Sequence, residues 1–315
     1  MQIEPSETAF VERYARGEAQ VVWTTLVADL ETPVSGFQKV AAGKPMSFLL
    51  ESVEGGAVRA RYSIIGLEPD LIWRANGNRA EINRVARTKA SAFAPCPEPP
   101  LTALRTLIAE SRIALPDSLP PMAAGVFGYL GYDMVRLIEE LPAPNPDPIG
   151  IPDAILIRPT IIVVFDSVKD SITVVTPVRP EHGVDAKTAL ARATERLSGV
   201  VEKFDAPLGK PLVETDARPL DVAPKSNTAP AEYTAMVLRV KEYIAAGDAF
   251  QIVLAQRFEA PFTLPPFALY RSLRRINPAP FLFFLDYGDF AVAGSSPEIL
   301  VRVRGDKVTI RPIAG

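Results

Sequence analysis

The segment ILIRPTIIVVFDSVKDSITVVT, residues 155–176, decides the fold class of this chain. It predicts two apolar, β-branched strands, over Ile155–Phe165 and Ser171–Thr176, which meet around the polar residues 167–170. Strands joined by so short a turn run antiparallel, because a parallel pair needs a much longer crossover. The segment therefore favours an antiparallel sheet over a doubly wound parallel one.

Patterns on the N-terminal side of this segment alternate in type. Short β-rich runs lie at Gln20–Leu30, Met46–Glu51, Tyr62–Ile65 and Asp70–Arg74. Helical spacing of apolar residues marks Leu101–Ile113, and Ala186–Val201 also predicts a helix. The chain is therefore expected to be α+β, with mixed, mainly antiparallel sheets packed against helices.

The C-terminal part repeats this alternation. Thr228 is placed to cap a helix that tolerates Pro230 in its first turn and ends at Gly247. A strand over Ile252–Phe258 and a helix over Phe267–Ile276 follow. Two hairpins are then predicted, with turns at 287–289 and 305–306.

The 31 prolines cluster between these patterns and mark connections, since proline removes a backbone donor and disfavours helix before it. The loosest cluster, from Pro207 to Pro230, divides the chain. We expect an N-terminal domain over 1–205, a linker over 206–230 and the first part of a second domain over 231–315.

Composition excludes several classes of protein. The net charge of −3 comes without a one-sided basic block, so no nucleic-acid footprint is present. A single cysteine, Cys96, and a single histidine, His182, form neither an internal disulfide nor a Cys/His metal cluster, which favours a reducing cytoplasmic compartment. The acidic start lacks the order of a secretory signal. Residues 154–165 are too short for a membrane span, so a soluble protein is expected.

No phosphate-binding loop, dinucleotide-binding glycine run or nucleophile elbow is present, so function is indicated by ordered segments instead. These segments are LLES at 49–52, RYSIIG at 61–66, AGVFGYLGYD at 124–133, GDAFQIVLAQRF at 247–258, NPAPFLFF at 277–284, GSSPE at 294–298 and RPIAG at 311–315. Together they resemble the anthranilate synthase component I family of chorismate-utilising enzymes. Gly125, Gly128 and Gly131 are equally explained as turn or close-packing glycines.

The resemblance implies a chemistry and its residues. Glu298 corresponds to the general acid that protonates the departing C4 hydroxyl of chorismate, provided that burial or another acid raises its pKa. Mg²⁺ is the implied cofactor, with its ligands expected downstream of this chain. The implied substrate-binding residues are Ser295, Ser296, Ala314 and Gly315.

Two positions separate the subfamilies. Isochorismate and salicylate synthases add water and need a base, which by resemblance is a lysine at the position of Gln251. A neutral amide cannot take a proton from water, whereas ammonia attacks without that help. Aminodeoxychorismate synthases typically carry a nucleophilic lysine where this chain has Ala314. The resemblance therefore implies ammonia as nucleophile and anthranilate as product, with ammonia supplied by a separate glutamine amidotransferase, component II, in a hetero-oligomer.

The family also implies feedback inhibition by tryptophan. The inhibitor would lie between Leu50, Glu51 and Ser52 on one side and an apolar wall on the other, with Glu51 accepting from its ammonium and Arg61 as a weaker donor to its carboxylate. The wall consists of Pro278, Pro280, Leu282 and Phe283.

Two alternatives stay open at this point. One is an aminodeoxychorismate synthase component I, which Ala314 opposes. The other is a non-catalytic fragment that binds tryptophan, because family members continue past the RPIAG segment into the metal-binding region.

We therefore expect the 315-residue chain by itself to form no anthranilate from chorismate, Mg²⁺ and ammonium. Fluorescence of the product measures this directly, and turnover by the purified chain would contradict it.

Overall fold

The computed structural model describes all residues except 42, 55–57, 60, 210–222 and 312–315. The chain forms two compact units, and each is discontinuous in sequence. The first combines Met1–Gly209 with Tyr270–Ser295, and the second combines Lys210–Leu269 with Ser296–Gly315. Our division into sequence-contiguous domains at 205 and 231 is of a different kind and stays a prediction.

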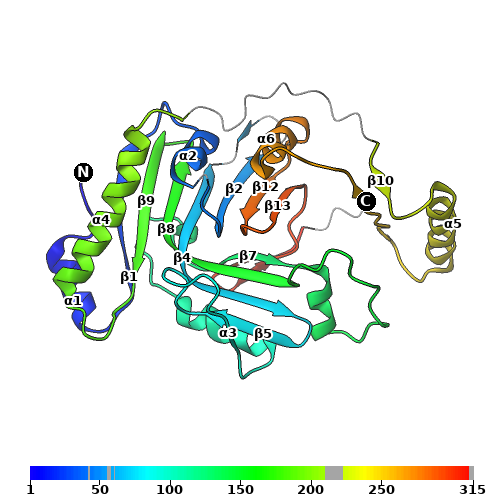
Figure 1. Cartoon of the computed structure of the whole chain (residues 1–315), viewed down its shortest axis with the longest axis horizontal. Coiled ribbons are helices and arrows are strands. Elements are labelled where there is room, and N and C mark those ends of the chain that lie inside the picture. Colours follow the sequence, from blue (N-terminus) through cyan, green and yellow to red (C-terminus); the bar gives the residue numbers. More distant parts are fainter. Residues whose placement is uncertain (42, 55–57, 60, 210–222, 312–315) are drawn as a thin grey trace. The chain divides into compact units, whose positions relative to one another are not determined.

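An eleven-stranded sheet organises the first unit (Figure 1). Its main path runs β1-β9-β8-β4-β2-β12-β13, and shorter strands branch from β2, β4, β5 and β8. The main strands are β1 (Gln20–Val27), β2 (Ser47–Glu54), β4 (Tyr62–Asn76), β8 (Ala154–Asp166), β9 (Ser171–Val178), β12 (Phe281–Asp286) and β13 (Ala291–Ser296). The branches are β3 (Val58–Arg59), β5 (Arg79–Asn83), β6 (Ala94–Pro95) and β7 (Phe127–Leu130). The strand pairs with described registers are antiparallel, which confirms the predicted class.

The long ladder between β4 and β8 joins two halves of this sheet. The first half of β4 pairs with β2 and its second half with β5, while β8 likewise changes neighbours from β7 to β9. The register shifts where the neighbours change, so that Pro69 faces Pro159, Leu71 faces Arg158 and Asp70 is the extra residue. Such a bulge bends the strand and redirects a side chain, and proline has no N–H to lose at this point.

Helices cover this sheet. They are α1 (Glu7–Ala15), α2 (Pro33–Val40), α3 (Pro100–Ser111), α4 (Ala186–Asp205) and α6 (Pro266–Ile276), with short 3₁₀ turns at Pro121–Ala123 and Tyr132–Leu137. Helix α4 begins where the carboxylate of Asp185 accepts from the backbone N–H of Thr188 at 2.8 Å. Its buried stripe, at helical spacing, consists of Ala189, Ala193, Leu197, Val200 and Phe204. This stripe packs α4 against β9 and β1.

The second unit holds α5 (Pro230–Ala246) and the short strands β10 (Lys225–Ser226), β11 (Phe258–Glu259), β14 (Arg302–Arg304) and β15 (Lys307–Thr309). Helix α5 buries none of its residues. Gly247, with φ 86°, ends it in the left-handed conformation as predicted. The predicted hairpin at 305–306 is present here between β14 and β15, and the predicted hairpin at 287–289 joins β12 to β13 in the first unit. Among the described helices, none is long and apolar enough to cross a membrane.

Three local predictions are wrong. Residues 252–257 form no strand, because only Phe258 and Glu259 pair, with β10. Ala229 rather than Thr228 occupies the N-cap of α5, and Pro230 begins the helix. The runs 62–65 and 70–74 belong to the single strand β4, since the bulge absorbs Pro69 without ending the strand.

Gly128 is required by close approach of backbone. A Cβ at this position would lie 1.9 Å from the carbonyl oxygen of Ile155 in β8, whereas a Cβ at Gly199 in α4 would meet open space. The glycines of the AGVFGYLGYD segment therefore include one with a packing role.

We predict that Gly128→Ala lowers the free energy of unfolding by more than about 1 kcal/mol, because β7 must move from β8. Gly199→Ala, the matched control, should raise it by about 0.4–1 kcal/mol through the helix. Urea unfolding measures both, and equal effects of the two substitutions would contradict the close approach.

Candidate functional site

Strand pairing brings together two predicted site segments that lie far apart in sequence. β2 and β12 are antiparallel neighbours, with Leu50 opposite Phe283, Glu51 opposite Leu282 and Ser52 opposite Phe281. The LLES and NPAPFLFF segments therefore meet within the first unit, next to each other in the sheet (Figure 1).

The same pairing divides the predicted residues between two faces. Successive side chains of a strand point to opposite faces, and directly opposed residues share a face. Leu50, Ser52 and Phe283 therefore lie on one face, and Glu51 and Leu282 lie on the other. One small ligand bound on the Ser52 face cannot also contact the Glu51 carboxylate through the intervening sheet.

Glu51 is held by two residues of α6. Its carboxylate accepts from the Tyr270 hydroxyl at 2.5 Å and from Arg274 Nε and Nη2 at 2.9 and 2.8 Å. The Glu51 side chain is 4% exposed and that of Arg274 is 19% exposed. Two parallel N–H bonds to one carboxylate form the strongest common ion-pair geometry.

Electrostatics around this cluster follow its burial. Burial raises the pKa of the Tyr270 phenol, and the negative charge of Glu51 raises it further. Burial lowers the pKa of the Arg274 guanidinium, but the hydrogen bond and charge of Glu51 outweigh it, so that pKa is raised. Tyr270 therefore stays a neutral donor and Arg274 a cation.

Aromatic packing fixes the helix that carries these residues. The ring of Tyr270 lies 5.8 Å from that of Phe284 in β12, and Phe284 also meets Phe37 of α2 edge to face at 5.6 Å. Tyr270 is fully buried and Phe284 is 1% exposed. The Glu51 cluster is therefore part of the packing of α6 on β2 and β12.

The other predicted inhibitor residues are less closely grouped. Arg61 forms a bidentate pair with Asp166, with N–O distances of 2.9–3.1 Å. Pro278 is exposed, Pro280 is half-buried and Leu282 is buried on the Glu51 face. The Phe283 ring packs across Gly294, where a Cβ would lie 2.0 Å from Cζ. Of the predicted inhibitor residues, Leu50, Ser52 and Phe283 are thus the ones that lie together on one face of the sheet.

The predicted catalytic and substrate residues divide between the units. Ser295, at the end of the first unit, donates from Oγ to the carbonyl of Asn277 at 2.6 Å. Gln251, Ser296 and Glu298 belong to the second unit. Gln251 and Glu298 are exposed, and Ser296 Oγ donates to the Glu298 carbonyl at 3.2 Å. Ala314 and Gly315 lie outside the described residues.

A metal site does not form in the part of the chain that the structure describes. No group of three or more His, Cys, Asp or Glu residues there is arranged to hold an ion. Mg²⁺ requires a set of oxygen ligands, so the described residues do not fit it and no chemical step here is assigned to a metal.

Tyr270 and Arg274 contact the predicted site residue Glu51 but lie outside the sequence motifs from which the site was predicted. Their spacing of four places both on one face of the predicted helix 267–276, which is the signal that could have found them. Their partner on another strand could not be read from that spacing.

Comparison with known proteins now defines the class. Residues 65–315 match the family model of the chorismate binding enzyme, so the chain belongs to that family. It is 50% identical to anthranilate synthase component 1 of Cereibacter sphaeroides over 98% of this chain and 61% of the relative. It is 39% identical to the Thermus thermophilus protein of the same name over 92% of this chain and 58% of the relative. These relatives confirm the predicted resemblance to anthranilate synthase component I.

Solved structures agree on the fold. The crystal structure of anthranilate synthase component I from Streptococcus pneumoniae matches with a TM-score of 0.60 and 30% identity, over 80% of this chain and 53% of that one. A menaquinone-specific isochorismate synthase from Escherichia coli, at 15% identity and a TM-score of 0.53, over 94% of this chain and 56% of that one, shows the fold alone. The chain spans about 60% of the length of the curated relatives named above.

We predict that Arg274→Gln lowers the free energy of unfolding by about 3–5 kcal/mol, because it leaves the buried Glu51 carboxylate without its cation. Arg275→Gln, an exposed neighbour on the same helix, is the matched control and should change it by less than about 0.5 kcal/mol. Urea denaturation measures the free energy of unfolding of both variants. A small effect of Arg274→Gln would mean that water hydrates the Glu51 carboxylate in the variant and would contradict the prediction.

Proposed function

We propose that this chain is the chorismate-using part of an anthranilate synthase, which converts chorismate and ammonia to anthranilate, pyruvate and water. The supporting observation is the 50% identity to an anthranilate synthase component 1 over 98% of this chain. Gln251 adds to it, because a neutral amide is a poor base for activating water.

In this proposal the residues of the chain supply a proton and orientation. Ammonia forms the new C–N bond, the ring hydroxyl leaves as water with a proton from Glu298, and loss of the enolpyruvyl group as pyruvate makes the ring aromatic. A carboxyl group keeps its proton near neutral pH only when burial or a second acid raises its pKa. Glu298 is exposed in this structure, so the proposal requires further groups to cover it in the active enzyme.

The proposed source of ammonia is a separate glutamine amidotransferase subunit. Amidotransferase chemistry that uses cysteine needs a thiolate, and burial raises the pKa of the Cys96 thiol instead of lowering it. Cys96 is therefore poorly suited to be an amidotransferase nucleophile. A second polypeptide should be needed when glutamine replaces ammonium.

We further propose tryptophan as a feedback inhibitor that binds on the face of Leu50, Ser52 and Phe283. The paired strands β2 and β12 place these residues side by side. In this arrangement Glu51 acts from the opposite face, by holding α6 through Tyr270 and Arg274. A ligand on these strands can bias the activity only by its differential affinity for two states of the protein.

The deciding assay uses a protein that carries this chain at the length of its curated relatives. It receives chorismate, Mg²⁺ and ammonium, and the products are separated and identified. Anthranilate supports the proposal. Isochorismate or aminodeoxychorismate as the main product would replace it with another activity of the family.

In the same protein, Glu298→Gln should lower turnover by about 10²–10⁴-fold, since the amide keeps the shape but cannot donate the proton to the leaving hydroxyl. Chorismate affinity should be largely kept. Glu242→Gln, on the exposed face of α5, is the control and should turn over normally. A nearly normal rate for Glu298→Gln would remove Glu298 from the proposed mechanism.

Ser52→Phe should relieve inhibition by tryptophan at least tenfold while turnover without tryptophan stays within about twofold, because an aromatic ring fills the space beside Leu50 and Phe283. Ser91→Phe, in an exposed loop, is the control. Inhibition curves measure both, and parental sensitivity of the Ser52 variant would place the inhibitor elsewhere.

A further inference from the structure

The first unit contains a cavity of about 400 Å³ that is rich in arginine. Its lining comes from α4, from the end of β9, from the loop after β5 and from the bulge between β4 and β8. Six arginines line it, namely Arg84, Arg87, Arg158, Arg179, Arg192 and Arg196. Among the described residues that line it, two are acids, Asp70 and Glu181. With Glu110, which lies outside the lining but pairs with Arg84, the six arginines face three acids, so a surplus of three positive charges gathers on a chain whose net charge is −3.

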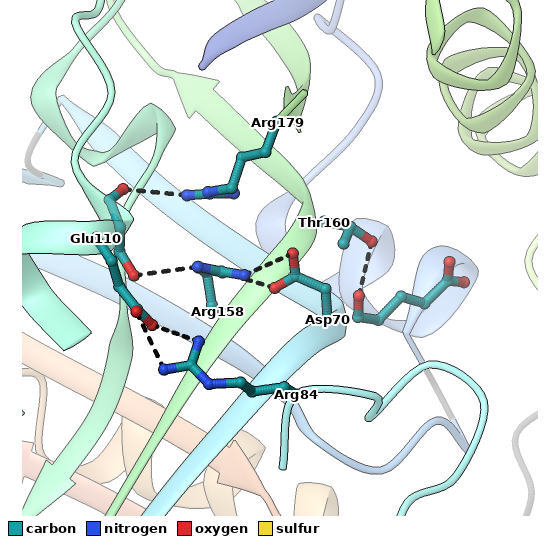
Figure 2. A network of polar contacts seen from close by, with 8 residues as sticks. Asp70, Arg84, Glu110, Arg158, Thr160 and Arg179 are labelled. Carbon is teal, nitrogen blue, oxygen red and sulfur yellow. Dashed lines mark hydrogen bonds and ion pairs between the residues drawn. The ribbon is translucent and has the colours of Figure 1, made fainter. Parts of the chain in front are cut away.

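Two of these arginines are neutralised by close carboxylates. Arg158 binds Asp70 through Nε at 2.7 Å and Nη2 at 3.0 Å (Figure 2). Arg84 binds Glu110 in the same bidentate way, at 2.8 and 3.0 Å. These pairs are sufficient to explain the presence of Arg84 and Arg158 without any ligand.

Arg179 is not neutralised in this way. Its Nη2 donates to the Ser111 carbonyl at 3.0 Å, at the C-terminal end of α3, where the helix dipole favours a cation. Its Nε is buried and lacks a hydrogen-bond partner among the described residues. Burial, followed by the neighbouring charge of Arg158, lowers the pKa of Arg179 to about 10. Figure 2 shows the guanidinium groups of Arg84, Arg158 and Arg179 gathered beside this end of α3.

Arg196 and Arg87 add to this surplus. Arg196 Nε donates to Thr176 Oγ1 at 2.8 Å, and no carboxylate within the described ranges forms an ion pair with Arg196 or Arg87. Burial, followed by the charge of Arg87, lowers the pKa of Arg196. Arg192 approaches Glu181 only at 3.7 Å, and both side chains are more than half exposed. Such an exposed pair contributes little.

We propose that this cavity binds a small organic or inorganic anion that carries at least two phosphate or carboxylate groups. Guanidinium forks match the oxygens of such groups. The volume lies within the range of small-molecule sites. Arg158, Arg179 and Arg196 are already held by Asp70, Ser111 and Thr176, so a ligand need not order them. The site shares no residue with the β2–β12 face and does not depend on the proposed function.

The test uses isothermal titration of the whole chain at low ionic strength with pyrophosphate, citrate and inorganic phosphate. We expect saturable binding of one pyrophosphate or citrate, tighter than that of phosphate, and weaker at high salt. Tighter binding of pyrophosphate than of citrate would indicate a phosphate ligand, and the reverse order would indicate a carboxylate ligand.

Arg87→Gln should weaken this binding about tenfold or more, as expected for the loss of one charge-assisted contact. Arg87 is exposed at the rim and forms no side-chain hydrogen bond in the part of the chain that the structure describes, so the fold should be unaffected. Arg196→Gln should weaken binding at least as much, and Arg239→Gln on α5 is the control.

Absence of binding by all three anions would overturn the proposal, including the case in which only an acidic protein partner binds. Equal affinity of Arg87→Gln, Arg196→Gln and the Arg239 control would overturn it too, because binding would then occur elsewhere. Neither outcome bears on anthranilate formation, so the two proposals fail separately.

Discussion

The antiparallel ladder between β4 and β8 is the interaction on which the rest of the first unit depends. Each strand is long enough to pair with different neighbours along its two halves. The bulge at Asp70 lies where those neighbours change, and it allows the strands to continue past Pro69 and Pro159. It also places Asp70 beside Arg158, so a backbone irregularity forms one wall of the arginine-lined cavity.

The pairing of β2 with β12 is the second interaction that organises the first unit. It joins residues separated by more than two hundred positions and buries a carboxylate between strand and helix. A buried charge costs several kcal/mol unless it is fully paired. Glu51 is paired on both oxygens, and the alternation of side chains keeps this cluster away from Ser52. Neighbouring residues of one motif therefore have different physical roles.

The two units differ in how they hold their candidate residues. In the first, Glu51, Tyr270 and Arg274 are fixed by burial and short hydrogen bonds. In the second, α5 buries none of its side chains, and Gln251 and Glu298 are exposed. General acid catalysis by a carboxyl group near neutral pH requires burial or a second acid beside it. The face of Leu50, Ser52 and Phe283 is therefore organised within the first unit, whereas the acid role proposed for Glu298 would require a more buried environment than it has here.

Local signals in the sequence were sufficient for several elements. The apolar runs of β8 and β9, the stripe of α4, the left-handed Gly247 and the turns at 287–289 and 305–306 all depend on neighbouring residues. The same local signals misled at 252–257, where β-branched residues were not enough to form a strand without a partner. The ordered motifs also identified the family, since they are properties of the chain itself.

Tertiary structure decided what depends on distance through space. No local pattern indicated that Arg274 would neutralise Glu51, because loop closure over 223 positions brings them together. Nor did the net charge of −3 reveal a basic cavity, since its arginines are scattered from residue 84 to residue 196. The sequence by itself determined periodicity, turns and family. Only the folded chain determined which charges are paired, which are buried and which face of a strand each motif residue occupies, because these depend on register and packing between remote segments.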